Sequence, residues 1–260
     1  MERVGIDIGG TFTDLVGLRD GEIVIDKTST TPDDPTRGVA TSLNEVGTDI
    51  AAVRDFLHGT TIAINTVLER KGAKTALITT KGFRDVYAIG RNNRPEAFNL
   101  EFRRPRPLVP RSLTWEVSAR MNARGGEIAP LDEAEVEAIA RQVLAEGVTS
   151  VAVCLLHSYA DPAHERAVGE VLARACPGVF VSLSHDILRE YREYERTSTT
   201  ALNAYVGPRV RSYLERLEDF LDGDGFGGSL QIMRSNGGTM SVGQARVQPV
   251  TMMESGPVAG

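Results

Sequence analysis

The chain is poor in cysteine and tryptophan, and its acidic residues outnumber its basic ones. Two cysteines and one tryptophan occur among 260 residues, and the net charge is -6. Because Cys154 falls in an apolar segment typical of a buried strand, we do not expect a disulfide framework. A reducing, cytoplasmic environment is expected instead. The negative balance disfavours nonspecific binding to nucleic acid and to anionic membranes.

Long hydrophobic runs are also missing. No apolar segment approaches the ~20 residues that a membrane-spanning helix requires. Near the N-terminus, Asp7 and two glycines interrupt the short apolar run, so we expect no signal peptide. Hydrophobic residues make up 41% of the chain and charged residues 25%, which is typical of a globular protein with one large or two modest cores.

Residues 4–16 carry the clearest chemistry. An apolar run leads into Asp-Ile-Gly-Gly-Thr-Phe-Thr-Asp at residues 7–14, and the chain then turns apolar again. This order predicts a strand, a tight turn and a second strand. Glycines at the turn let a phosphate approach the backbone N–H groups, although an ordinary Gly-Gly hairpin is the alternative.

The side chains around this turn receive candidate roles. Asp7, at the end of the first strand, is placed to hold Mg²⁺ through its water shell, and Asp14 either orients the turn or reaches the same ion. The candidates for phosphate binding are Gly9, Gly10, Thr11, Thr13 and Asp14.

A second polar stretch, His-Gly-Thr-Thr, occupies residues 58–61. The pattern predicts a strand that ends at His58 and a helix over about residues 61–71, capped by Thr60. A histidine and hydroxyls beside a helix start suit an anion or a carbonyl oxygen, whereas the alternative is a histidine bonded only to backbone. The catalytic candidates are Asp7, His58 and Thr60, and the substrate-binding candidates here are His58, Thr60 and Thr61.

Two arginines lie in a polar loop at residues 90–95. Their guanidinium groups suit a carboxylate or a phosphate, so Arg91 and Arg94 join the substrate-binding candidates; a solvated loop is the alternative. His157 and His164 invite a metal site, but strand ends and helix starts bring such residues together without an ion.

The rest of the chain predicts an α/β fold. An amphipathic helix over residues 131–146, an apolar strand over 148–156, another helix and a strand over 180–183 indicate parallel pairing. Charges of alternating sign follow, and we place a domain boundary there, between 1–184 and 185–260. A long helix or a helix pair is expected over 201–221, with an interruption at Gly207 and Pro208.

Several segments together resemble the hydantoinase A/5-oxoprolinase family. They are residues 7–14, 58–72, 189–200, 203–205, 235–238 and 255–257. The resemblance implies an actin-like ATPase (ribonuclease H-like) lobe whose mixed sheet opens in antiparallel strands, plus the start of a second lobe. It assigns residues 1–184 to the N-terminal domain of the family and residues 185–260 to the beginning of a hydantoinase A-type domain.

The resemblance also implies an activity. Family members open cyclic amides such as 5-oxoproline or hydantoins with ATP and Mg²⁺, through a phosphorylated carbonyl oxygen, and a hydantoinase B-type partner subunit and a homo-oligomer are expected. The alternatives are the ATPase subunit of an acetone-type carboxylase, which acts on a ketone, and a non-catalytic nucleotide-binding subunit. A carbohydrate kinase is a further class, but no sugar-binding loop rich in asparagine and aspartate can be identified.

Members of this family are longer and carry a second Asp-x-Gly-Gly-Thr loop after the Ser-Gly-Pro segment. Residues 235–239, Ser-Asn-Gly-Gly-Thr, lack the carboxylate at the strand end and are not expected to replace it. We therefore expect an N-terminal portion that is inactive as an ATPase on its own.

Overall fold

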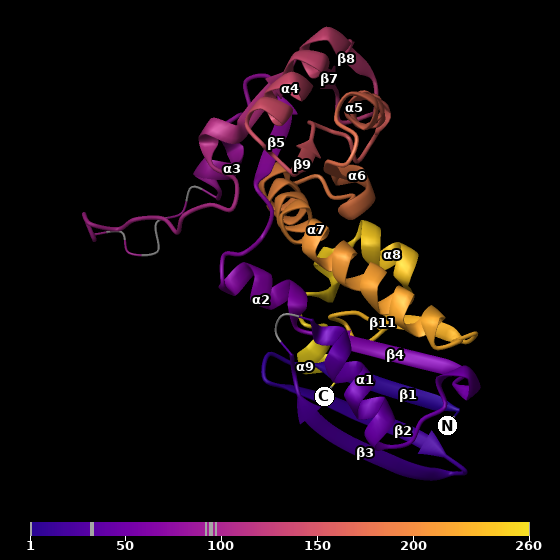
Figure 1. Ribbon diagram of the computed structural model, residues 1–260. Coiled ribbons are helices and arrows are strands. Elements are labelled where there is room, and N and C mark those ends of the chain that lie inside the picture. The colour runs from indigo at the N-terminus through magenta and orange to yellow at the C-terminus, as the bar shows by residue number, and fades with distance from the viewer. Residues whose placement is uncertain (1, 32–33, 92, 94–95, 97, 260) are drawn as a thin grey trace. The chain divides into compact units, whose positions relative to one another are not determined.

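The computed structural model describes residues 2–31, 34–91, 93, 96 and 98–259 (Figure 1). Contacts divide the chain into two compact units. We call residues 1–72 with 209–260 the N-terminal unit, and residues 73–208 the inserted unit. These units interleave along the sequence, so they do not correspond to a cut at residue 184, and the division into family domains there stays a prediction.

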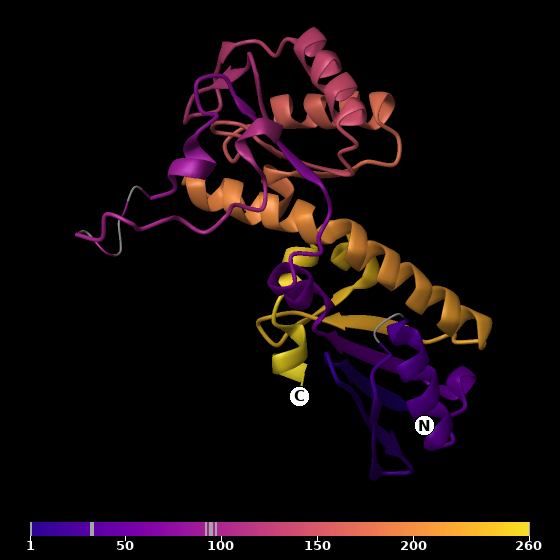
Figure 2. The ribbon, with the colours of Figure 1, turned by 60° about the vertical axis from the view of Figure 1, so that its left-hand side comes forward.

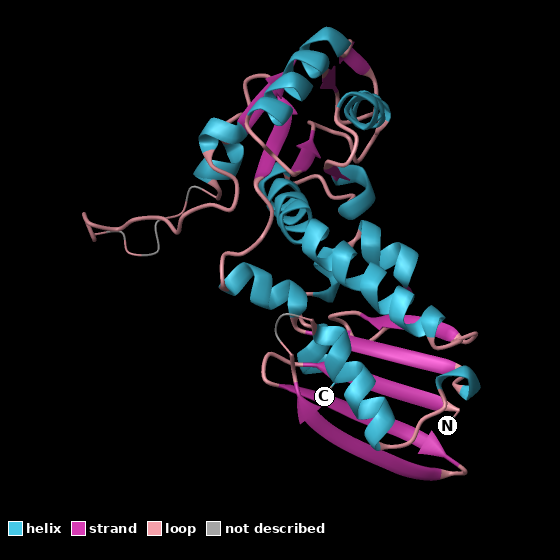
Figure 3. Ribbon diagram, viewed as in Figure 1, coloured by secondary structure: helices cyan, strands magenta, loops and turns pink. Residues whose placement is uncertain are grey.

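The N-terminal unit is built on a six-stranded mixed sheet (Figure 3). Its order is β12-β11-β4-β1-β2-β3, with β1 Arg3–Ile8, β2 Phe12–Arg19, β3 Glu22–Ser29, β4 Asp55–Thr60, β11 Ser229–Met233 and β12 Thr239–Ser241. β1, β2 and β3 pair antiparallel, whereas β4 pairs parallel with both β1 and β11. The predicted opening in antiparallel strands is confirmed.

One face of this sheet is packed. Val4, Ile6 and Ile8 of β1 are buried, and α1 (Pro35–Glu45) lies across this face (Figure 2). Asp34 caps α1 by accepting a hydrogen bond from the Thr36 N–H at 3.2 Å, and Pro35 occupies the first turn. The 3-10 turn η1 (Ile50–Ala52) then leads into β4.

Short helices complete the N-terminal unit. α2 (Ile62–Leu68) follows β4 and stops before the predicted residue 71, because Arg70 adopts a left-handed backbone with φ 56°. α8 (Val242–Val247) and η3 (Pro249–Met252) follow β12. α9 (Ser255–Ala259) packs against β4, β1 and β11.

The inserted unit carries a four-stranded parallel sheet in the order β10-β9-β5-β6. The strands are β5 Thr75–Thr80, β6 Thr114–Val117, β9 Ser150–Cys154 and β10 Phe180–Leu183. Every residue of β9 is buried, as its continuous apolar run predicts. The other elements are α3 Val86–Ile89, η2 Arg111–Leu113, the hairpin β7 Arg120–Met121 and β8 Glu127–Ala129, α4 Glu133–Ala145, α5 Ala163–Ala175 and α6 Ser184–Ile187.

Helix α7 (Glu193–Gly223) is continuous through Pro208. A proline removes the hydrogen bond to the carbonyl four residues earlier, here that of Ala204. The Ser150 hydroxyl donates to that carbonyl at 2.6 Å, and the Ala73 N–H donates to the next carbonyl, Tyr205, at 2.9 Å. The Ser150 hydroxyl thus replaces the donor that Pro208 lacks, which explains why the predicted interruption does not break the helix. Among the described helices, none is both long and apolar enough to cross a membrane.

Candidate functional site

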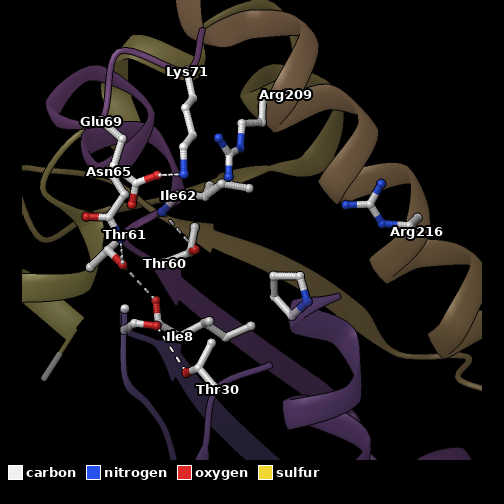
Figure 4. A pocket seen from close by; sticks show the side chains of 13 residues that line it. Ile8, Thr30, Thr60, Thr61, Ile62, Asn65, Glu69, Lys71, Arg209 and Arg216 are labelled. Atoms are coloured by element: carbon white, nitrogen blue, oxygen red, sulfur yellow. Dashed lines mark hydrogen bonds and ion pairs between the residues drawn. The ribbon is translucent and has the colours of Figure 1, made fainter. Parts of the chain in front are cut away.

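The turn between β1 and β2 borders a cavity of about 410 Å³ that lies within the N-terminal unit (Figure 4). The Thr30 hydroxyl donates to the Gly9 carbonyl at 3.1 Å, and the Thr30 N–H donates to the Thr11 carbonyl at 2.9 Å, so the residue that follows β3 fixes the turn. We call this cavity the glycine-turn pocket. Its lining residues are Ile8, Gly9, Gly10, Thr30, Pro35, Thr60, Thr61, Ile62, Asn65, Glu69, Lys71, Arg209 and Arg216.

The second wall of the glycine-turn pocket is the corner between β4 and α2. The N–H and the hydroxyl of Thr61 both donate to the Ile8 carbonyl, at 3.0 and 3.2 Å. The Asn65 side-chain amide donates to the Thr61 hydroxyl at 3.0 Å, and the Thr60 hydroxyl accepts from the Ile62 N–H at 3.2 Å. This corner therefore presents an amide and hydroxyls beside the turn.

The third wall is cationic. Lys71 pairs with Glu69 at 2.8 Å, while Arg209 and Arg216 reach in from α7. These three cations were not predicted from the sequence, because they lie far along the chain from the glycine turn. The available signal was the seven-residue spacing of Arg209 and Arg216, which puts them on one helix face.

A second cavity, of about 490 Å³, contains the carboxylates, and we call it the carboxylate pocket. Asp7 and Asp14 lie opposite each other in the β1–β2 pair and both line it. Lys27 pairs with Asp14 at 2.6 Å. The Asp7 Oδ1 atom is buried and has no hydrogen-bond partner among the described residues. Burial, and then the charge of Asp14, raises the pKa of Asp7 to about 6.

Two glycines allow backbone to close over Asp7. A Cβ at Gly59 would lie 2.9 Å from Asp7 Oδ1, and a Cβ at Gly256 would lie 3.2 Å from the same atom. Ser255 fastens this closure, since its hydroxyl donates to the Thr60 carbonyl at 2.8 Å and accepts from the Thr60 N–H at 3.3 Å. Three motifs that are far apart in sequence, residues 7–14, 58–61 and 255–257, thus meet at one carboxylate.

Comparison with known proteins identifies the family. Residues 3–176 match the hydantoinase/oxoprolinase N-terminal region, and residues 196–260 match the hydantoinase/oxoprolinase family. The chain belongs to the hydantoinase/oxoprolinase family.

The similar proteins include enzymes. An uncharacterized protein of Methanocaldococcus jannaschii is 41% identical over 263 residues, which cover 99% of this chain and 39% of that protein. The caprolactamase subunit alpha of Pseudomonas jessenii is 33% identical over 269 residues, covering 99% and 38%. The nucleotide-free structure of acetone carboxylase, an ATP-dependent enzyme, matches with a TM-score of 0.87 and 29% identity, covering 99% and 39%.

These matches settle the fold. It is the α/β actin-like ATPase type that the sequence predicts. This chain spans about two fifths of the length of the relatives named above.

His58 of this hydantoinase/oxoprolinase chain lies outside both pockets. It is fully buried; its Nδ1–H donates to the Ile6 carbonyl at 3.2 Å, and its Nε2 accepts from the Tyr213 hydroxyl at 2.6 Å. Burial lowers the pKa of His58 to about 4, so the ring is neutral near pH 7. His58 therefore links β1 and α7 and does not line either pocket, and its catalytic role stays a prediction.

The two threonines predicted to bind phosphate at the glycine turn, Thr11 and Thr13, lie in different surroundings. Thr13 is fully buried, its hydroxyl bonds that of Thr30 at 3.1 Å, and a Cβ on Gly38 of α1 would approach it to 2.7 Å. The Thr13 side chain thus packs under α1 instead of reaching the pocket. Thr11 is exposed at the tip of the turn.

The predicted arginine candidates belong to the inserted unit. The Arg91 Nε donates to Glu195 Oε1 at 2.6 Å, and Arg91 lines a separate cavity of about 430 Å³ with Arg104 and Tyr194. Arg94 lies outside the described residues. The candidate substrate-binding residues are therefore divided between the two units.

The histidines of the inserted unit have side-chain partners. His164 Nε2 lies 2.8 Å from Glu127 Oε2, and His157 Nδ1 lies 3.0 Å from the Tyr159 hydroxyl. In the described part of the chain, no three or more histidine, cysteine, aspartate and glutamate side chains are grouped to hold a metal ion. A cation at Asp7 would thus depend on water and on a second ligand.

Proposed function

We propose that this chain is the N-terminal part of an ATP-dependent enzyme that opens a cyclic amide, such as 5-oxoproline or a hydantoin. The observation that carries the proposal is the unpartnered, buried Oδ1 atom of Asp7, beside the Gly9–Gly10 turn and opposite Asp14. Carboxylates with raised pKa values cluster at functional sites. Membership of the family and the similarity to an ATP-dependent acetone carboxylase support ATP use.

The residues at the turn fit a nucleotide phosphate and Mg²⁺. Gly10 is exposed, and a Cβ there would meet only the Asn65 amide, at 3.5 Å, so backbone is open to a ligand. A divalent cation beside Asp7 and Asp14 would offset the repulsion between the two carboxylates. Magnesium commonly uses one or two carboxylates and keeps several waters. Bound ATP with Mg²⁺ supplies the phosphoryl group that activates the substrate carbonyl.

The chain's own residues would position the reactants. The Gly9 N–H donates to the Phe12 carbonyl at 2.9 Å and closes the turn, so the Gly10 N–H would be the one that faces the phosphate. Asp7 and Asp14 would hold the water shell of the cation. Asn65 uses one of its two amide hydrogens on Thr61, which leaves the other for a substrate carbonyl oxygen. The net reaction consumes two waters: one is added across the ring C–N bond, and the other accounts for the conversion of ATP to ADP and phosphate. In this proposal, positioning and charge stabilisation are the protein's main contribution.

A second candidate is the ATPase subunit of an acetone-type carboxylase. The similarity to acetone carboxylase, with a TM-score of 0.87, favours it. Both candidates activate a carbonyl oxygen with ATP, and they differ in whether water or a carboxyl group is then added. We further propose a cytoplasmic homo-oligomer that works with a hydantoinase B-type partner, because the caprolactamase relative is one subunit of an enzyme.

Nucleotide binding tests the role of Asp7. ADP is titrated calorimetrically into the chain with and without Mg²⁺, for the wild type and for Asp7→Asn. We expect at least a tenfold loss of ADP affinity in Asp7→Asn and no remaining Mg²⁺ dependence. Asp20→Asn is the matched control, because Asp20 lies exposed in the β2–β3 turn, where φ is 51° and asparagine is tolerated. Equal ADP affinity in wild type and Asp7→Asn would refute the assignment.

Turnover tests the proposed incompleteness of the site. We propose that residues 1–260 alone hydrolyse ATP about a thousandfold more slowly than a full-length relative, because charge must be stabilised on both sides of the transferred group. A steady-state assay with Mg²⁺ and 5-oxoproline measures this rate. A rate comparable to that of a full-length relative would show that the chain already holds a complete site.

A further inference from the structure

We propose that the glycine-turn pocket selects a substrate that carries a carboxylate, and that Arg209 and Arg216 bind this group. The inference rests on the proposed function, which places the reacting carbonyl beside the turn. It narrows the substrate class from cyclic amides in general to acidic ones.

The charge of the glycine-turn pocket is opposite to that of the chain. Three cationic side chains and one carboxylate line it, in a protein whose net charge is -6. A concave site with charge of one sign concentrates ligands of the other sign. None of the described lining residues is aromatic, so this lining offers no surface on which a nucleotide base stacks. The lining thus favours a small anion.

The arginines keep most of their donors for a ligand. Lys71 is neutralised by Glu69 at 2.8 Å. Arg216 spends one N–H on the Ser212 hydroxyl, at 2.9 Å, out of five that a guanidinium carries. Among the described residues, the Arg209 guanidinium has no hydrogen bond or ion pair, and its charge adds to that of Lys71 in lowering the pKa of the Glu69 carboxyl.

A neighbouring arginine on the same helix shows the contrast. Arg211 points away from the pocket lining and pairs with Glu215, four residues on, at 3.0 Å. On the solvent side of α7, Arg211 thus has a carboxylate partner within the chain. Among the described residues, Arg209 and Arg216 form no ion pair with a carboxylate. An incoming carboxylate would fill that role.

The geometry separates the two ends of the ligand. Arg209 and Arg216 stand two helical turns apart, about 10 Å along the axis, and both extend from α7 toward the strand ends (Figure 4). Thr61 and Asn65 line the same pocket from the α2 corner. A guanidinium matches a carboxylate through two parallel hydrogen bonds. The carboxylate would lie against α7 and the ring carbonyl against Asn65, in a volume of about 410 Å³ that suits a small molecule.

Selectivity for an acidic lactam follows from the free-energy cost of leaving the hydrogen-bond donors of Arg209 and Arg216 without an acceptor. A neutral lactam would displace water from the arginines without replacing its hydrogen bonds. Sites built to bind a polar group reject analogues that lack it more strongly than apolar sites reject extra groups. We therefore expect discrimination between two lactams that differ only in the carboxylate.

Equilibrium binding without nucleotide tests the inference. The probes are 5-oxoproline, 2-pyrrolidinone (the same ring with hydrogen in place of the carboxylate) and inorganic phosphate. The wild-type chain should bind 5-oxoproline at least tenfold more tightly than 2-pyrrolidinone. Arg209→Gln and Arg216→Gln should each weaken 5-oxoproline binding about tenfold or more, the usual loss of a charged hydrogen bond. Arg211→Gln, which removes the same charge from the same helix, should leave it unchanged.

Three results would overturn the inference. They are the absence of 5-oxoproline binding, equal affinity for the two lactams, and an equal loss in Arg209→Gln and Arg211→Gln. Binding of phosphate that depends on Arg209, without binding of 5-oxoproline, would instead assign these arginines to phosphate and also refute the carboxylate. Since no nucleotide is present, failure here is distinct from failure of the Asp7 experiment, which uses ADP and no lactam.

Discussion

Asp7 and Asp14 face each other across the antiparallel β1–β2 pair, and Lys27 pairs with Asp14. Like charges directly opposite each other in a sheet are destabilising. The fold accepts this cost at the end of its central strand, beside a glycine turn that is open to solvent. Such local conflicts are expected where a sequence serves binding rather than stability.

Replacing Asp7 by asparagine should stabilise the chain. The side chain keeps its size but loses the repulsion from Asp14, for a gain of about 0.5–1 kcal/mol near pH 7. Thermal unfolding at pH 7.5 without Mg²⁺ measures it as a rise of a few degrees at most. Asp20→Asn, in the exposed turn, should leave the melting temperature unchanged. A lower melting temperature for Asp7→Asn would mean that the carboxylate stabilises the fold.

His58 should make the N-terminal unit sensitive to acid. Its pKa is lowered from 6.5 to about 4 by burial, so the unfolded chain binds a proton in this window and the native chain does not. The contribution is fully present above pH 6.5 and is lost as the pH falls to about 4, by about 3 kcal/mol.

Denaturant unfolding between pH 4 and pH 7 measures the effect of His58. His58→Gln should lower stability at pH 7 and flatten the slope across this window. His157→Asn, in the inserted unit, should retain the wild-type slope. An unchanged slope in His58→Gln would show that other groups set the acid sensitivity.

Gly256 should not tolerate a side chain. A Cβ there would lie 2.6 Å from Thr61 Cγ2 and 3.2 Å from Asp7 Oδ1. Gly256→Ala should therefore cost about 1–3 kcal/mol through overpacking and weaken ADP binding. Gly243→Ala in α8, where the nearest atom is 4.0 Å away, is the control and should be neutral or slightly stabilising. Equal melting temperatures for both variants would contradict close packing at Asp7.

Part of the stability that Ser150 contributes should depend on Pro208. Its hydroxyl serves the Ala204 carbonyl that the proline leaves unpaired, so Ser150→Ala should cost about 1–3 kcal/mol. In a Pro208→Ala background, the restored N–H takes over that carbonyl, and the same change should cost about 1 kcal/mol less. A double-mutant cycle on unfolding free energies measures the coupling. Additive effects would show that Ser150 acts elsewhere.

Features set by local pattern could be predicted from the sequence. The glycine turn after Asp7, the Asp34 cap of α1 and the apolar strand β9 all follow from neighbouring residues. Two outcomes depended on distant partners. His58 is buried against Tyr213, 155 residues later, and α7 continues through Pro208 because the Ser150 hydroxyl supplies the missing hydrogen bond.

The candidate site could be predicted from the sequence only where its residues are neighbours in the chain. Asp7, Gly9, Gly10, Thr60 and Thr61 were found because their motifs are contiguous, and the structure places them around the two pockets of the N-terminal unit. Arg209 and Arg216 were missed because nothing near them in the sequence indicates which strand ends the helix will face. The strand ends that α7 faces are known only once β11, which follows α7 in the chain, has been placed beside β4.

The position of β11 next to β4 also sets an order of assembly on the ribosome. β4 ends at Thr60 and β11 begins at Ser229, so at usual elongation rates roughly ten to thirty seconds separate the synthesis of the two strands. During that time the edge of β4 has no strand to pair with, whereas residues 73–208 emerge as one uninterrupted stretch. Of the two units, the inserted one can therefore be finished before the N-terminal one, although synthesis of the N-terminal unit starts earlier.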